Sequence, residues 1–255
     1  MGQRLLRQFG ETADHPQLRG LGHDHHRLRT RTSHGQGRIR RLSVLTFQVF
    51  SFPAGADAPD CGMELYFIRH GETAWSLTGQ HTGKTDLPLT AHGEAEARTL
   101  VPRLQGVSFD HTFTSPRQRA RRTAELAGHA GAVVEPDLAE WDYGDYDGQR
   151  MAEIHAQRPD WDIYTDGCPG GESPEQIMAR ADRLIARWSA LTSRVAAFSH
   201  GHFGRVLVAR WIGLPLAMGK HFLINTASCG ILDRDPGHGG LTRIVQWNLT
   251  SARPT

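Results

Sequence analysis

From residue 63 onward, short apolar runs alternate with amphipathic segments along the chain. Residues 65–68 and 195–198 are continuous apolar runs, a pattern typical of strands that are buried on both faces. Further strands are predicted at residues 112–114, 228–232 and 244–247, and helices at residues 90–104, 116–127, 174–188 and 202–212. Strands that alternate with helices predict an α/β fold, with a largely parallel sheet covered by helices on both faces.

Capping residues predict where several of these helices begin and end. Thr90 is expected to cap the helix over residues 90–104. Ser115 as N-cap and Pro116 at the first helical position are expected to begin the next helix, and Gly128 to close it. His202 is expected to cap the helix that it begins.

The first 62 residues have no sustained helical or strand period. They contain nine Arg, no Lys and five acidic residues, a net charge of +4, whereas the remainder has 20 basic and 22 acidic residues, a net charge of −2. Such a composition buries too little apolar surface to offset chain entropy. We therefore predict a disordered basic N-terminal extension over residues 1–62 and one folded domain over residues 63–255.

Two stretches of this extension have a second interpretation. Residues 23–26 (His-Asp-His-His) could bind a metal ion, but a solvated polar run is the favoured interpretation. Residues 40–56 resemble a secretory signal, with two arginines before an apolar stretch. That stretch begins far from residue 1 and contains polar residues, so an extension without this function is favoured.

The composition also limits the partners that we expect. Cys61, Cys168 and Cys229 are too few and too scattered for a disulfide framework or a zinc site, which indicates reduced thiols and a cytoplasmic location. No stretch approaches the roughly 18 apolar residues that a membrane-spanning helix needs. The slightly acidic domain has no positive field to recruit nucleic acid, so we expect neither a membrane nor a nucleic acid as partner.

Polar clusters follow three of the predicted strands. They are residues 69–73 (RHGET), 115–119 (SPRQR) and 199–202 (SHGH). Ligands of open α/β sheets bind beyond the carboxyl ends of the strands. If these strands are neighbours, two histidines and two arginines converge there, namely Arg69, His70, Arg119 and His200.

This set of residues suits phosphoryl transfer. The reaction needs cationic donors around the phosphoryl oxygens and an in-line nucleophile. Arginine offers forked donors and stays charged, and neutral imidazole is a competent nucleophile near pH 7. We expect His70 to attack through one ring nitrogen while a backbone carbonyl holds the other, with Gly71 leaving room for the turn. Arg119 is expected in the first turn of its helix, where N–H groups also favour anions.

The leaving oxygen needs a proton, and a carboxylic acid beside the pocket is the usual donor. The candidates lie in residues 140–147, and the residues alone do not choose among Glu140, Asp142, Asp145 and Asp147.

Six segments together resemble the histidine phosphatase superfamily, in its phosphoglycerate-mutase-like branch. They span residues 63 to about 250 in the order of the family: residues 69–73, 79–90 (GQHTGKTDLPLT), 115–124 (SPRQRARRTA), 140–148, 170–173 (GGES) and 199–201. The nearest pattern is that of small acid phosphatases often labelled phosphoglycerate mutase. Residues 79–90 also resemble relatives of sedoheptulose bisphosphatase. Residues 63–255 are thus identified as a histidine phosphatase catalytic domain.

The resemblance implies a three-layer α/β/α sandwich whose mostly parallel mixed sheet has one antiparallel strand. It implies that His70 is the nucleophile and Glu140 the proton donor. It also implies that the transferred phosphoryl group is bound by Arg69, Arg119 and His200. Neither cofactor nor metal is expected, since the arginines and a protonated His200 would supply the positive charge.

The resemblance also suggests further binding residues. Phosphate contacts are expected from Thr82, Gly83 and Gly201, and specificity from Gln80, Trp141 and Tyr143. For Trp141 and Tyr143 we weigh two roles equally: they shape the substrate pocket, or they pack in the core.

The function that these residues predict is an acid-phosphatase-like phosphomonoesterase. It would hydrolyse a small phosphorylated metabolite through a phosphohistidine intermediate, and a homodimer is one possible assembly. The first alternative is a cofactor-dependent phosphoglycerate mutase, but mutases typically have Glu-Arg-His-Tyr-Gly where residues 140–144 read Glu-Trp-Asp-Tyr-Gly. The second alternative is a non-catalytic protein that binds a phosphorylated ligand.

Overall fold

The computed structural model describes residues 62–250. The predictions of a disordered extension, a metal-binding run and a secretory signal lie outside the described residues, as does Cys61.

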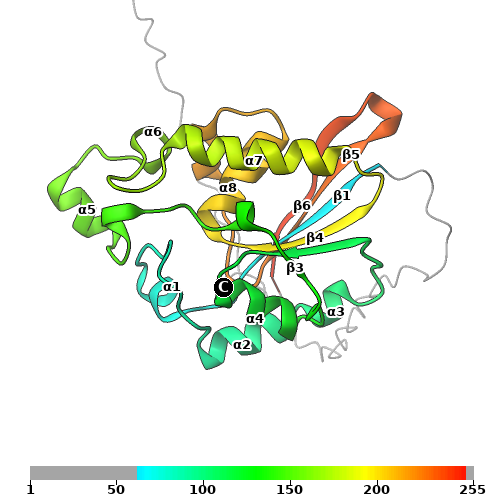
Figure 1. Cartoon of the computed structure of the whole chain (residues 1–255), viewed down its shortest axis with the longest axis horizontal. Helices are drawn as coiled ribbons and strands as arrows, with labels where there is room; N and C mark the ends of the chain where they lie inside the picture. Colours follow the sequence, from blue (N-terminus) through cyan, green and yellow to red (C-terminus); the bar gives the residue numbers. More distant parts are fainter. Residues whose placement is uncertain (1–61, 251–255) are drawn as a thin grey trace, which may run out of the picture. The chain divides into compact units, whose positions relative to one another are not determined.

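A mixed sheet of six strands forms the centre of the described domain, in the order β3-β2-β4-β1-β5-β6 (Figure 1). Its strands are β1 (Glu64–Arg69), β2 (His111–Thr114), β3 (Val133–Val134), β4 (Arg194–Ser199), β5 (Cys229–Asp235) and β6 (Leu241–Leu249). Strand β1 pairs in parallel with β4, and β2 pairs in parallel with both β3 and β4. Strand β5 is antiparallel to both of its neighbours, β1 and β6. It therefore runs against all the other strands of this sheet, as the family resemblance implied.

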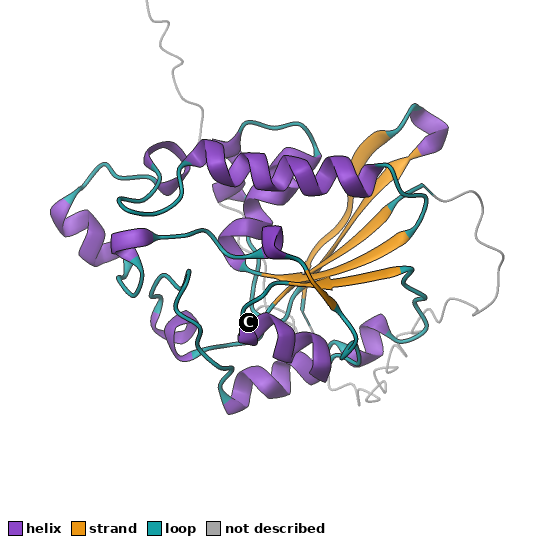
Figure 2. Cartoon of the chain, viewed as in Figure 1, coloured by secondary structure: helices purple, strands orange, loops and turns teal. Residues whose placement is uncertain are grey.

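Helices cover both faces of this sheet (Figure 2). In Figure 1, α6, α7 and α8 lie on one side of the strands, and α2, α3 and α4 lie on the other. The helices are α1 (Ala74–Thr78), α2 (Ala91–Arg98), α3 (Val101–Leu104), α4 (Gln118–Leu126), α5 (Met151–Gln157), α6 (Ile163–Asp166), α7 (Pro174–Ser189) and α8 (Gly201–Trp211). Short 3-10 helices span Pro136–Leu138, Gly144–Tyr146, Leu216–His221 and Pro236–His238.

Two hydrophobic cores separate the three layers. Successive side chains of a strand point to opposite faces, and β4 is buried on both. Val195 and Ala197 belong to the core beneath α7 and α8, and Ala196 and Phe198 to the core beneath α3 and α4. The predicted three-layer sandwich is therefore confirmed.

The predicted helix over residues 90–104 is wrong in one respect, because it is broken in two. Thr90 caps α2 as expected, since its Oγ1 accepts a hydrogen bond from the backbone N–H of Gly93 (2.9 Å). However, α2 ends at Arg98 and α3 begins at Val101. Pro102 lacks an N–H, and its ring would clash with the carbonyl of Arg98 in a continuous helix.

The start of the next helix also differs from the prediction. Helix α4 begins at Gln118 with Arg117 as its N-cap residue, two residues later than Pro116. The Ser115 hydroxyl contacts the imidazole of His200 (2.7 Å). Gly128 follows the end of α4 with a φ of +93°, as expected of a residue that closes a helix.

Within residues 62–250, no helix combines the length and the apolar character that crossing a membrane requires. Cys168 and Cys229 are both buried free thiols.

Candidate active site

The three polar clusters meet where strands β2, β4 and β1 end. These strands are neighbours, and their register pairs Arg69 with Ser199 and Thr114 with Phe198. The hydrogen bonds continue one residue further, from the His70 N–H to the Ser199 carbonyl (3.0 Å). The sequence-based expectation that these segments share one edge of the sheet is therefore confirmed.

His70 is buried directly after β1, with 4% of its surface exposed. Its Nδ1 lies 2.7 Å from the Gly71 carbonyl oxygen. A carbonyl only accepts hydrogen bonds, so Nδ1 carries the proton and Nε2 keeps a free lone pair. Burial, and then the charges of Arg119 and Arg69, lower the pKa of His70 well below its ordinary value. The ring is therefore neutral near pH 7, the form in which an imidazole can attack.

Gly71 is required at the turn that follows. A Cβ added there would lie 2.3 Å from the carbonyl oxygen of Gly93 in α2. The Gly71 N–H also donates to Thr123 Oγ1 in α4 (3.0 Å). The close approach of α2 and the bond to α4 fix the orientation of the His70 segment.

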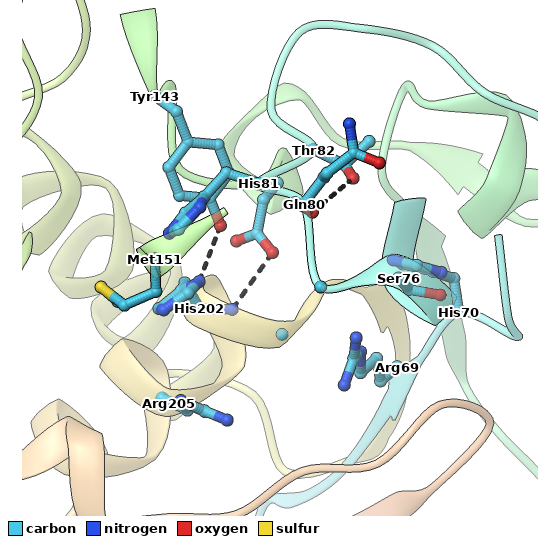
Figure 3. Close-up of a pocket in the computed structure, with 13 residues that line it drawn as sticks. Arg69, His70, Ser76, Gln80, His81, Thr82, Tyr143, Met151, His202 and Arg205 are labelled. Atoms are coloured by element: carbon cyan, nitrogen blue, oxygen red, sulfur yellow. Dashed lines mark hydrogen bonds between the residues drawn. The ribbon is translucent and has the colours of Figure 1, made fainter. Parts of the chain in front are cut away.

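A cavity of about 270 Å³ opens beside His70 (Figure 3). It is lined by Arg69, His70, Ser76, Gly79, Gln80, His81, Thr82, Glu140, Tyr143, Met151, Gly201, His202 and Arg205. Arg69 and His70 lie on one side of it, and Tyr143, Met151 and His202 on the other (Figure 3).

Arg69 presents its guanidinium group to this cavity. One terminal nitrogen donates to the Ile224 carbonyl (2.7 Å), while the buried Nε has no protein partner. Gly201 lies beside this guanidinium, since a Cβ there would be 3.4 Å from its Cζ, an ordinary contact distance. Because Arg69 lines the cavity and stays charged, it is suited to an anion there.

Arg119 and His200 are fully buried and adjoin His70 without lining the cavity. The ring centroids of His70 and His200 are 5.2 Å apart. Arg119 donates from Nε to His200 Nδ1 (3.2 Å) and from its terminal nitrogens to the carbonyls of Thr82 (2.8 Å), Gly83 (3.2 Å) and Thr85 (3.0 Å).

The expected protonation of His200 is wrong. Burial, followed by the charge of Arg119, lowers the pKa of His200 well below its ordinary value. The structure thus has a neutral imidazole there, and the positive charge comes from the arginines alone.

Of the four acids that the sequence left open as proton donors, Glu140 alone lines the cavity. Its carboxylate accepts hydrogen bonds from the backbone N–H groups of Trp141 (2.9 Å), His202 (3.1 Å) and Phe203 (2.8 Å). The last two belong to the first turn of α8, so the free N–H groups of a helix start hold this carboxylate.

Two of the other acids have structural partners elsewhere. Asp147 accepts from the backbone N–H groups of Gly83 (2.6 Å) and Thr85 (3.1 Å) and from the Thr85 hydroxyl (2.6 Å). Asp142 forms an ion pair with Lys84 (2.6 Å).

Besides Arg119 and His200, two further predicted binding residues, Gly83 and Trp141, do not line the cavity. The Gly83 N–H is already bonded to Asp147, so it is not free for a phosphate. The Trp141 side chain is fully buried in the core, and its Nε1 donates to the Glu172 carbonyl (2.9 Å). Packing is therefore the role that the structure gives to Trp141. Gln80, Thr82, Tyr143 and Gly201 do line the cavity.

The wall opposite His70 contains residues that the sequence did not single out as binding residues. The expected capping by His202 is wrong: it lies inside α8, and its Nδ1 shares a hydrogen bond of 2.7 Å with the Tyr143 hydroxyl. The His81 ring stacks on His202 with centroids 5.8 Å apart, and its buried Nε2 has no protein partner. Arg205 lies one turn after Gly201 in α8, a spacing that could have indicated it.

Two loops build this wall together. The His81 N–H donates to the Gln149 carbonyl (2.9 Å), and the Gly148 N–H donates to the His81 carbonyl (2.8 Å). The Gln80 side chain adds a bond from Nε2 to the Gly148 carbonyl (2.8 Å). The loops around residues 80 and 149 therefore form one hydrogen-bonded unit.

Known proteins resemble this chain over its described part. Residues 65–250 match the family model of the histidine phosphatase superfamily, branch 1. An acid phosphatase of Mycobacterium tuberculosis is 44% identical over 177 residues, which are 68% of this chain and 87% of that protein. A sedoheptulose 1,7-bisphosphatase of Saccharomyces cerevisiae is 39% identical over 181 residues, 58% of this chain and 66% of that protein.

A solved structure extends the likeness to the fold. The product of an open reading frame of Mycobacterium tuberculosis superposes with a TM-score of 0.69 at 40% identity, covering 74% of this chain and 99% of that one. These comparisons support a phosphatase, which is a hydrolase, as the sequence predicted. The matched residues include every strand end that builds the cavity, and the chain belongs to the histidine phosphatase superfamily, branch 1.

Proposed function

We propose that this phosphatase hydrolyses small phosphate monoesters through a phosphohistidine at His70, with Glu140 as the proton donor. The observation that carries the proposal is the state of His70. It is neutral, its Nδ1 is bonded to Gly71, and the ring lines the same cavity as Arg69 and Glu140.

The first step of the proposed reaction is attack by His70 Nε2 on the phosphorus of the ester. The new P–N bond forms as the P–O bond to the leaving group breaks, and the electron pair departs with the leaving oxygen. That oxygen takes the proton of Glu140 and leaves as an alcohol.

The second step returns the enzyme to its starting state. Glu140, now a carboxylate, takes a proton from a water molecule, and the resulting hydroxide attacks the phosphorus. The P–N bond breaks, inorganic phosphate leaves and His70 Nε2 recovers its lone pair. The guanidinium group of Arg69, a residue that lines the cavity, would bind a phosphoryl oxygen in both steps.

Trapping the intermediate tests the nucleophile. We expect brief incubation with a labelled phosphate ester, quenched in alkali, to leave an acid-labile phosphoryl group on the parent protein. Peptide mapping should locate it at His70, and His70→Ala should carry no label and release no phosphate while keeping its circular dichroism spectrum. Retention of a tenth or more of the parent rate by His70→Ala would exclude this assignment.

The leaving group tests the proton donor. Glu140→Gln should lower kcat/KM for glycerol 2-phosphate by about 100-fold or more, because an alkoxide needs a proton in order to leave. p-Nitrophenyl phosphate should lose much less, since its leaving group is stable as an anion. Equal losses on the two esters would point to another acid.

The phosphoglycerate mutase alternative is tested with 3-phosphoglycerate and a bisphosphoglycerate primer. The proposal predicts that phosphate release exceeds formation of 2-phosphoglycerate. A screen of sugar phosphates, phosphoglycerates and nucleotides then ranks the substrates that the cavity accepts.

A further inference from the structure

One partly buried arginine, Arg180, bonds the loop that carries Glu140 to helix α7. Arg180 lies in α7, with 13% of its side chain exposed, and it pairs with Glu172, with 11% exposed. Its Nε donates to Glu172 Oε1 (2.7 Å), and one terminal nitrogen donates to Oε2 (2.8 Å). This forked geometry is available to arginine but not to lysine.

The remaining donors of Arg180 reach the backbone that leads into the proposed acid. They bond to the carbonyl oxygens of Asp137 (2.6 Å), Ala139 (2.9 Å) and Glu140 (3.3 Å). An arginine has five N–H donors, so every one of them has an acceptor here. One guanidinium group thus fixes the course of the chain into Glu140.

Glu172 fixes the chain that leaves Glu140. Its backbone N–H donates to the Asp142 carbonyl (2.9 Å), and its own carbonyl accepts from Trp141 Nε1 (2.9 Å). The arginine and the glutamate therefore hold the segments before and after the acid, respectively.

Arg180 also contacts the residue that holds the carboxylate itself. Its Cζ lies 4.8 Å from the centroid of the Phe203 ring, a cation–π arrangement. The Phe203 N–H is the donor to Glu140 Oε1 (2.8 Å). The backbone of Glu140 and the N–H group that orients its carboxylate are thus both tied to the same guanidinium.

We propose that Arg180, paired with Glu172, is a positioning residue that aims the Glu140 carboxyl at the leaving oxygen. Arg180 does not line the cavity beside His70, so it acts through Glu140 and not on the substrate. This inference rests on the proposed function of Glu140 as proton donor.

The test separates positioning from general stability by varying the leaving group. Removing the arginine alone would leave the partly buried Glu172 carboxylate without its ion-pair partner, which is destabilising. The double variant Arg180→Met/Glu172→Gln removes both charges and keeps similar side-chain volumes. We expect it to fold and to lose at least about tenfold more kcat/KM on glycerol 2-phosphate than on p-nitrophenyl phosphate. The ratio kcat/KM is used because it reports only the steps up to transfer of the phosphoryl group.

Arg183 provides a matched control on the same helix. It also forms a forked pair, donating to Asp137 Oδ1 (2.8 Å) and Oδ2 (3.1 Å), but 58% of its side chain is exposed. Arg183→Met should change kcat/KM on both esters by less than about twofold.

The Glu140→Gln variant, measured in parallel, distinguishes failure of the positioning role of Arg180 from failure of Glu140 as proton donor. When Arg180→Met/Glu172→Gln is added to Glu140→Gln, kcat/KM on glycerol 2-phosphate should show no further selective loss. The carboxylic acid that Arg180 positions is already absent from that variant. Equal losses on both esters, or a selective loss that persists in that background, would overturn the positioning role while Glu140 stays the proton donor. If Glu140→Gln is itself unselective, the proposed acid fails and the positioning role fails with it.

Discussion

The Nε–H of Arg119 donates a hydrogen bond of 3.2 Å to Nδ1 of His200. A guanidinium group cannot accept hydrogen bonds, so Nδ1 of His200 is the acceptor and carries no proton. In the neutral ring the proton then lies on Nε2, which donates to the Ser115 hydroxyl oxygen (2.7 Å). The second histidine of the site is thereby held as one neutral tautomer by its two neighbours.

Nitrogen NMR should detect this tautomer directly. In uniformly ¹⁵N-labelled protein near pH 7, His200 should show an unprotonated Nδ1 and a protonated Nε2, with the signals assigned by loss in His200→Asn. Burial and Arg119 lower the pKa of His200, so the pattern should persist down to about pH 6. Two protonated nitrogens near pH 7 would contradict the tautomer.

The pH dependence of activity should reflect His70. Burial and the two arginines lower its pKa, so the attacking form persists below the ordinary value of 6.5. We therefore expect kcat/KM for p-nitrophenyl phosphate, corrected for substrate ionisation, to be level between about pH 7 and about pH 6. A fall with its midpoint near 6.5 would mean that His70 titrates as an ordinary exposed histidine.

The free energy of unfolding, unlike kcat/KM, should fall as the pH is lowered below about 6.5. His70, His200 and His202 all have lowered pKa values in the folded protein, with burial as the largest cause. Below about pH 6.5 the unfolded chain binds protons at these positions and the folded chain does not, so stability present above that pH is lost as the pH falls. Each histidine should contribute about 1.4 kcal/mol per pH unit to this loss. Urea unfolding between about pH 6.5 and about pH 5.5 measures the slope of the free energy of unfolding against pH. His202→Asn should lower this slope by the contribution of one proton, about 1.4 kcal/mol per pH unit.

Gly71→Ala should impair both the fold and the reaction. The added methyl group would lie 2.3 Å from the Gly93 carbonyl oxygen, so the His70 turn or helix α2 must move. We expect a loss of about 1–3 kcal/mol in the free energy of unfolding, together with a lower kcat/KM on both esters. Gly131→Ala is the control, because a Cβ there meets nothing within 4 Å. Parent-like activity of Gly71→Ala would show that the close contact does not set the position of His70.

Asp147→Asn should lower activity without selectivity for the leaving group. The carboxylate accepts from three donors of Gly83 and Thr85, and the carbonyls of both residues accept from Arg119. An amide nitrogen repels N–H donors, so the loop should loosen, at a cost of about 1–3 kcal/mol in stability. Steady-state kinetics should show similar losses of kcat/KM on glycerol 2-phosphate and p-nitrophenyl phosphate. A loss confined to glycerol 2-phosphate would instead make Asp147 the proton donor.

The strands at the centre of the fold were predictable because a strand that is buried on both faces consists of consecutive apolar residues. Residues 65–68 and 195–198 are apolar throughout, since β1 and β4 contact both helical layers, and the clusters that end them follow directly in sequence. The short edge strand Val133–Val134 and helix α5 carry no comparable signal, because few of their side chains enter a core. Helix α6 has only four residues, too few to show a helical period.

Local rules failed where a tertiary contact or a neighbouring residue outweighed them. Ser115 has the sequence context of an N-cap, and its Oγ accepts from the Arg117 N–H (3.3 Å), but it also contacts His200, 85 positions further along the chain, and α4 begins only at Gln118. The contact between His81 and His202 in the cavity wall was not predictable for the same reason. His81 and His202 come together through the packing of a loop against α8, and no spacing in the sequence encodes that contact.

The proposed reacting groups and the opposite cavity wall have different origins, which has a consequence for engineering. His70 and Glu140 are held by strand ends and by the start of α8, whereas Gln80, His81 and Met151 come from the paired loops around residues 80 and 149. Those two loops share their hydrogen bonds, so exchanging one alone would break the pairing. Grafting both at once from another phosphatase should transfer its substrate preference and leave the chemical steps of this enzyme in place.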